Sequence, residues 1–146
     1  MPWGNENCVV VPVDFSESTP DAVRKAVEIA AEPQDVHIVY VVPELDFVSP
    51  GVVFGNVTDE SRVTAAKKFM HEYLQKHSLP EVQTHVLMGD PGTTAVKFAT
   101  KQNADLIVIP SHGYHGVKHL LLGSVAERII RHANCAVLVL RRHDAE

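Results

Sequence analysis

The chain has 146 residues, 45% of them hydrophobic, and a formal net charge of -5. These values fit one ordinary domain with a packed core and exclude a disordered chain. The acidic balance and the scattered basic residues disfavour nucleic acid as a partner. No apolar stretch approaches the roughly 18 residues of a membrane span, so we expect no membrane partner either.

Two cysteines, Cys8 and Cys135, are each flanked by apolar residues typical of strands. Their spacing matches no zinc motif, and we expect two buried thiols in a reducing compartment rather than a disulfide. The N-terminal residues lack the basic and then apolar layout of a secretory signal. We therefore expect residues 1–146 to form a single cytoplasmic domain.

The first half of the chain predicts two strands and two helices in alternation. Residues 8–13 and 36–42 are short, almost continuously apolar runs, typical of strands buried on both faces of a parallel sheet. Apolar residues at helical spacing predict a helix between them, with Pro20 in its first turn. A second helix should follow Thr58, its expected N-cap. The two apolar stripes are Val23, Ala26, Val27 and Ala30, and Val63, Ala66, Met70, Tyr73 and Leu74.

Residues 43–56 form one long irregular segment with several apolar side chains. Long loops inside small domains are usually functional or mobile. We expect this segment to pack as a lid over a site, against a partner subunit, or against its own domain.

The second half predicts three more strands and two more helices. Residues 82–88 alternate between apolar and polar side chains, as an edge strand does, whereas 106–109 and 136–140 are almost continuously apolar. The last helix should begin at Ser124, because Glu127 lies three residues on, at the spacing of a capping box. The apolar helix residues that we expect to face inward are Ala95, Val96, Ala99, Val125, Ile129 and Ile130.

Strands and helices thus alternate from end to end. This order predicts an α/β fold: an open, five-stranded parallel sheet with helices on both faces. In such sheets, ligands bind beyond the carboxyl ends of the strands, where the strand order reverses.

The segment after the fourth predicted strand has the composition of an anion site. Gly113 and Gly116 allow the backbone to turn tightly and approach a ligand. Gly123 and Ser124 open a helix, whose N–H groups and positive dipole end favour phosphate. A plain glycine loop before a capped helix would have the same spacing, so both interpretations stay open at this point.

Other chemistries fit less well. His112, His115 and His119 lie close in sequence, but no flanking Cys, Asp or Glu completes a ligand set, so we expect no metal site made of side chains. Asp14, His112 and a serine could form a hydrolytic triad, yet the Gly-x-Ser-x-Gly elbow is absent. The P-loop pattern and Gly-x-Gly-x-x-Gly are absent as well.

From Cys8 to Arg141 the chain resembles the universal stress protein family. The resemblance is carried by the opening Val-Pro-Val-Asp-Phe-Ser and by the stretch PSHGYHGVKHLLLGSVAERIIRHANCAVLVL, which begins at Pro110. It implies the strand order 3-2-1-4-5 of a Rossmann-like fold of the adenine nucleotide alpha hydrolase type. ATP-binding members carry Gly, two residues, Gly, nine residues, Gly, and then Ser or Thr. Gly113, Gly123 and Ser124 fit this motif, whereas Pro110 replaces its first glycine.

Carried over residue by residue, the resemblance implies an ATP site, with magnesium or manganese bound through the phosphates. Asp14 would contact the ribose or adenine, although its position alone also fits a helper for the first helix. The backbone of Val41 would contact the adenine. The implied ATP-binding residues are Pro12, Val13, Asp14, Val41, Ile109, Pro110, Gly113, Gly123, Ser124 and Val125.

The last strand predicts a partner. Residues 136–140 lack the charges and prolines that protect an edge strand, which favours pairing with a second copy of the chain. The resemblance also implies a homodimer through this strand. The alternative is a monomer whose edge is covered by the segment around Trp3.

Three functions follow from these observations. The first is an ATP-binding regulatory module of the stress response, read by protein partners that the sequence does not identify. The second is a dimeric interaction protein that binds no nucleotide, which Pro110 favours because proline lacks an N–H. The third and least favoured is an enzyme acting on a small phosphorylated substrate. No nucleophile and base are evident, so we expect any ATP hydrolysis to be slow.

Overall fold

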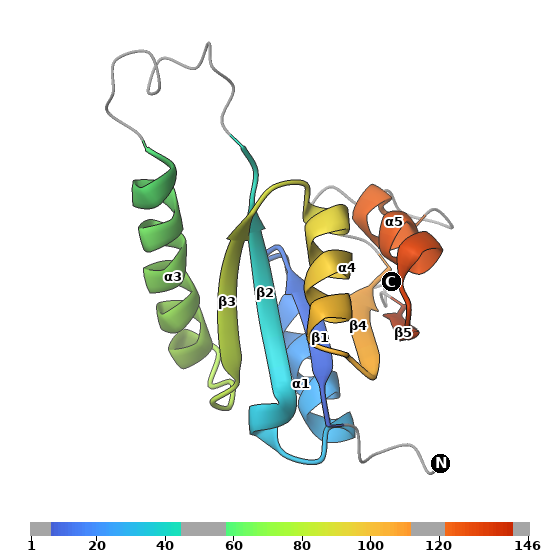
Figure 1. The fold of residues 1–146 in the computed structure, drawn as a ribbon. Coiled ribbons are helices and arrows are strands. Elements are labelled where there is room, and N and C mark those ends of the chain that lie inside the picture. Colours follow the sequence, from blue (N-terminus) through green and yellow to red (C-terminus); the bar gives the residue numbers. More distant parts are fainter. Residues whose placement is uncertain (1–6, 45–57, 112–121, 142–146) are drawn as a thin grey trace, which may run out of the picture.

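The structure is a computed structural model that describes residues 7–44, 58–111 and 122–141 (Figure 1). Within them, strands and α-helices alternate as predicted, and each strand lies within one residue of its predicted bounds. The strands are β1 (Val9–Val13), β2 (Val36–Val42), β3 (Gln83–Met88), β4 (Leu106–Pro110) and β5 (Ala136–Leu140). The helices are α1 (Thr19–Ile29), α3 (Asp59–Lys76), α4 (Pro91–Lys101) and α5 (Ser124–His132), with a short 3-10 helix η1 (Pro33–Asp35) before β2.

The five strands form one sheet in the order β3-β2-β1-β4-β5, and all four neighbouring pairs are parallel. This confirms the expected fold, with β3 and β5 at the two edges. Helices α1 and α3 pack on one face, and α4 and α5 pack on the other (Figure 1). Alternate β1 side chains serve the two layers: Val9 and Val11 face α1, whereas Val10 faces α4 and α5.

The central strands β1 and β4 separate toward their carboxyl ends. They pair only through Val9 with Leu106 and Val10 with Ile107, whereas β1 stays paired with β2 along its whole length. Each strand carries a proline in the part where β1 and β4 are not paired with each other, Pro12 in β1 and Pro110 in β4. Proline cannot donate a ladder hydrogen bond. A crevice can therefore open where the strand order reverses.

Several helix ends match the sequence prediction. Pro20 lies in the first turn of α1. Thr58 is the N-cap of α3, where its hydroxyl accepts a hydrogen bond of 3.0 Å from the N–H of Ser61. A cap of this kind contributes about 1 kcal/mol to helix stability. The cap of α4, Asp90, was not predicted; its carboxylate accepts from the N–H of Thr93 at 2.9 Å.

The predicted start of α5 at Ser124 is confirmed, but two other details of the prediction were wrong. Gly123 is the N-cap and Ser124 the first helical residue, so the Ser124 capping box does not form. Ile129 is fully buried as predicted, but Val125 and Ile130 are 39% and 42% exposed. Ala126 and Ile129, three residues apart, make the face that packs on the sheet. Val125 and Ile130 lie outside this narrow stripe.

Cys8 and Cys135 precede β1 and β5, respectively. Both are free thiols, half-buried rather than fully buried as predicted. Burial, followed by the negative charge of Asp105, raises the pKa of each thiol. Raised pKa values favour the protonated, unreactive form.

Among the helices of the described segments, none is both long and apolar enough to cross a bilayer.

Candidate functional site

A cavity of about 390 Å³ lies at the carboxyl edge of the sheet, where β1 and β4 separate. Its volume is typical of small-molecule sites, which measure about 300–1,000 Å³. All the implied ATP-binding residues that the structure describes line it. These residues are Pro12, Val13, Asp14, Val41, Ile109, Pro110, Gly123, Ser124 and Val125.

Several predicted features lie outside the described residues. They include Gly113 and Gly116 of the expected phosphate loop, the histidine cluster at 112–119, Trp3, and most of the irregular segment 43–56. The roles expected for these residues stay predictions.

Asp14 follows β1 at the rim of the cavity. Its carboxylate accepts a hydrogen bond of 3.0 Å from the N–H of Ser16, and the Thr19 hydroxyl lies 3.4 Å away. The N-cap of α1 is Ser18, so Asp14 supports the turn before the helix rather than occupying the cap position. These contacts hold a negative charge in a fixed place beside the cavity.

The backbone turns sharply at the next residue. Phe15 has a φ of 61°, a left-handed conformation that is uncommon for residues other than glycine. Its ring packs against Tyr40, Phe69 and Tyr73, with centroid distances of 4.8, 4.9 and 5.1 Å. This aromatic packing offsets the backbone strain, which costs about 1–3 kcal/mol. Phe15 therefore belongs to the core beside α3, whereas Asp14 lines the cavity.

The first turn of α5 forms the opposite wall. No side chain among the described residues caps this end, and the N–H groups of the first turn have no acceptor within the helix. The N–H of Gly123 donates to the carbonyl of Ser111 at 3.0 Å, and the N–H of Ser111 donates to that of Leu140 at 2.8 Å. These bonds anchor the start of α5 to the ends of β4 and β5. The positive end of the helix dipole is thus held beside the cavity, an arrangement that favours an anion.

The sequence analysis missed part of the wall: Val39, Tyr40, Pro43, Pro91 and Ala126 also line the cavity. Pro91 follows the third strand, β3, whose carboxyl end lies at the same edge of the sheet. The position of Pro91 after a strand could have identified it, because each helix that follows a strand of a parallel sheet begins at the carboxyl edge.

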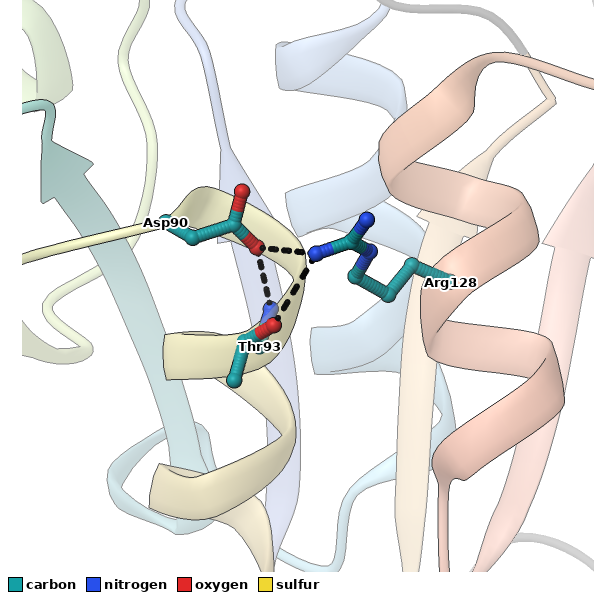
Figure 2. Close-up of polar contacts among 3 residues, drawn as sticks. All are labelled: Asp90, Thr93 and Arg128. Atoms are coloured by element: carbon teal, nitrogen blue, oxygen red, sulfur yellow. Dashed lines mark hydrogen bonds and ion pairs between the residues drawn. The ribbon is translucent and has the colours of Figure 1, made fainter.

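An ion pair between Asp90 and Arg128 joins the start of α4 to α5, and Figure 2 shows it with the neighbouring Thr93. Arg128 Nη1 lies 3.2 Å from Asp90 Oδ2 and donates to Thr93 Oγ1 at 3.3 Å. Hydrogen bonds from the N–H and hydroxyl of Thr93, assisted by the charge of Arg128, hold the pKa of Asp90 below its usual value. Asp90 therefore stays ionised at neutral pH.

The residues of the cavity fit an adenine nucleotide. Apolar side chains suit a purine base, Asp14 can accept from a hydroxyl, and the α5 terminus can receive phosphate. Within residues 7–44, 58–111 and 122–141, no three His, Cys, Asp or Glu side chains converge on a possible metal position.

Both the sequence and the fold match known proteins. Residues 7–141 match a model described as the universal stress protein family. Universal stress protein MJ0531 of Methanocaldococcus jannaschii is 35% identical over 147 residues, 94% of this chain and 84% of the relative. The structure of UspA from Lactobacillus plantarum is 26% identical, with a TM-score of 0.71 over 92% of this chain and 98% of that one. A universal stress protein from Archaeoglobus fulgidus in complex with dAMP is 25% identical, with a TM-score of 0.60 over 90% and 95% of the two chains.

Proposed function

The chain belongs to the universal stress protein family, and on this basis we propose that it binds ATP in the cavity at the carboxyl edge of the sheet. One observation carries the proposal: residues from β1, β2, β4 and α5 that the family motif implies converge on a single cavity. The Archaeoglobus fulgidus relative in complex with dAMP supports an adenine nucleotide as the ligand.

Each part of the nucleotide has a matching part of the cavity. The backbone of Val41 would contact the adenine, and Asp14 would accept from a ribose hydroxyl. The phosphates would approach the start of α5 at Gly123, Ser124 and Val125, where the N–H groups of Ser124 and Val125 and the helix dipole favour negative charge. Magnesium or manganese would accompany the phosphates, and Gly113 is expected to assist.

Pro110 removes one possible backbone contact with the nucleotide but does not oppose ATP binding in this cavity. The residue lies at the end of β4 and lines the cavity, where it offers a ring but no N–H. The phosphate contacts proposed here come from α5 instead. ATP binding therefore does not depend on the N–H that proline lacks.

We propose that the bound nucleotide regulates contacts with other proteins in the cytoplasm. Among the described residues that line the cavity, we identify no nucleophile next to a general base. This composition fits a binding module better than an enzyme. Any ATP hydrolysis should accordingly be slow.

A homodimer through β5 is the second part of the proposal. This strand is at the edge of the sheet, pairs with β4 and carries half-buried apolar residues. Leu122, Val125 and Ile130 add exposed apolar side chains on and next to α5. If the protein bound no nucleotide, this surface would favour the alternative of an interaction protein.

Isothermal calorimetry with ATP and magnesium tests the nucleotide site. The parent should bind, and Gly123→Val should bind more weakly because its side chain would stand where phosphate approaches. Gly123 has a φ of -61° and a ψ of 156°, which valine can adopt, so lost binding would not reflect backbone strain. Circular dichroism should show that the variant is folded.

The contrary outcomes are clear. Unchanged ATP affinity in Gly123→Val would refute this site. No binding by the parent, together with no nucleotide detected by mass spectrometry in the purified protein, would favour the interaction protein.

A further inference from the structure

Two helices form the wall of the nucleotide cavity on one face of the sheet. Pro91 comes from the first turn of α4, and Ser124, Val125 and Ala126 come from the first turn of α5. The two turns are far apart in sequence, so their spacing depends on contacts between the helices.

Arg128 links these two turns (Figure 2). Its guanidinium reaches from α5 to Asp90 Oδ2 at 3.2 Å and to the Thr93 hydroxyl at 3.3 Å. The same Asp90 oxygen accepts the Thr93 N–H at 2.9 Å, so it also caps α4. One carboxylate oxygen thus holds both the start of α4 and the side chain from α5.

Gly92 allows this contact to be close. A Cβ atom added to this buried residue would lie 3.0 Å from Cβ and Cδ of Arg128 and 3.1 Å from its Cγ. The Cβ of Arg128 is attached directly to the α5 backbone, so a side chain at position 92 would push the helix itself. The close contact between Gly92 and Arg128 therefore fixes the distance between α4 and α5 next to the ion pair.

A second polar contact joins the same two helices near their C-terminal ends. Asn134, just after α5, donates from Nδ2 to Thr100 Oγ1 of α4 at 3.2 Å. Asn134 and Thr100 line a different, smaller cavity and not the nucleotide cavity. The Asn134 contact thus provides an internal comparison for the Arg128 contact.

We propose that Arg128 and Asp90 form a positioning pair that sets the spacing of the α4 and α5 termini and so favours nucleotides with phosphates over the bare nucleoside. The inference rests on the proposed function. Arg128 acts through α5 and does not itself touch the ligand. Because the field of a helix dipole falls off within one turn, a small shift of Ser124 and Val125 would weaken the contact with phosphate.

The pair should matter more for binding than for stability. Both side chains are about half exposed, at 52% and 53%, and exposed ion pairs contribute little to folding. Variants should therefore fold and still lack the spacing. The helical packing beneath, with Ala95 and Ile129 fully buried, stays in place.

Two variants with opposite charge changes separate positioning from simple electrostatics. Arg128→Gln removes a positive charge, and Asp90→Asn removes a negative charge while keeping a good N-cap residue. Positioning predicts that both variants bind ATP about fivefold more weakly in calorimetry and bind adenosine within about twofold of the parent. Arg128→Lys, which keeps the charge, should recover part of the loss.

Two controls complete the design. Arg131→Gln removes the same charge from the same helix. Arg131 pairs with Glu127 within α5, at 2.7 Å, and does not contact Asp90. Asn134→Ala breaks the distant contact between the two helices. Both controls should bind ATP like the parent. In the nucleotide-free protein, the amides of Gly123 and Glu127 donate to the carbonyls of Ser111 and Gly123. Their hydrogen exchange should be faster in Arg128→Gln and Asp90→Asn than in the parent and the controls.

Several results would overturn the positioning role. Tighter ATP binding by Asp90→Asn with weaker binding by Arg131→Gln would show a general charge effect. An equal loss in Asn134→Ala would show general helix packing. Unchanged affinity in both pair variants, with a parent that binds ATP, would refute the pair and leave the proposed function intact. A parent that binds no ATP would overturn both, and unchanged hydrogen exchange would refute the pair without reference to any ligand.

Discussion

Replacing Ile129 or Ile130 with alanine tests which face of α5 packs on the sheet. The two residues are adjacent in one helix, but Ile129 is 0% exposed and Ile130 is 42% exposed. Both substitutions remove the same methyl and methylene groups and change helix propensity equally. Their free energies of unfolding should therefore differ only because of burial.

The expected loss at Ile129 is large. Its side chain packs with Ala95, Ala99 and Ile107 in the buried cluster beneath α4 and α5. Removing three buried carbon groups, each contributing about 0.8 kcal/mol, and leaving a cavity behind should cost about 3 kcal/mol.

The expected loss at Ile130 is small. A partly exposed side chain leaves no closed cavity, and the higher helix propensity of alanine offsets part of the lost contact, so we expect about 1 kcal/mol or less. The two variants should thus differ by about 2 kcal/mol.

Guanidinium unfolding followed by circular dichroism measures both values from the midpoint and slope of the transition. Light scattering must show the same oligomeric state for parent and variants, because a subunit interface at Ile130 would add to its loss. Equal losses at the two positions, or a larger loss at Ile130 in a monomer, would refute this orientation of α5.

Two further predictions concern β5 and the histidines between β2 and β3. Val139→Pro should remove a hydrogen-bond donor from β5 and shift a dimer toward monomer, whereas a parent that scatters light as a 16.1 kDa monomer at micromolar concentration would contradict the dimer. His37 Nδ1 and His85 Nε2 lie 3.0 Å apart, and burial lowers the pKa of both rings, with the charge of His37 lowering that of His85 further. Because the folded state favours neutral rings, the free energy of unfolding should fall as pH decreases from the unfolded value of about 6.5 through the lowered folded values. His85→Gln should flatten this pH dependence in denaturation experiments, and an identical slope in parent and variant would count against the histidine pair.

The sequence by itself determined the kind and order of the elements. Runs such as 36–42 are almost continuously apolar because β2 is covered on both faces, and this pattern is local. The cap at Thr58 was also predicted, because its partner Ser61 is only three residues away. The strand order came from the family resemblance rather than from the apolar pattern.

The candidate site was predictable to the extent that it follows from topology. Parallel strands end at one edge, so Asp14, Val41 and Ile109 come together once the strand order is known. The resemblance supplied that order and the identity of the residues. Pro91 was missed, although its position after β3 places it at the same edge of the sheet.

Only the tertiary structure decided the features that depend on long-range packing. The sequence predicted that Val125, Ile129 and Ile130 face inward, but the fit against the sheet selected Ala126 and Ile129. Val125 and Ile130 are exposed. Asp90 and Arg128 are 38 positions apart, and neither residue type nor spacing predicts their contact. Local patterns reflect the period of one element, whereas such contacts depend on how separate elements are rotated and spaced when their buried faces pack together.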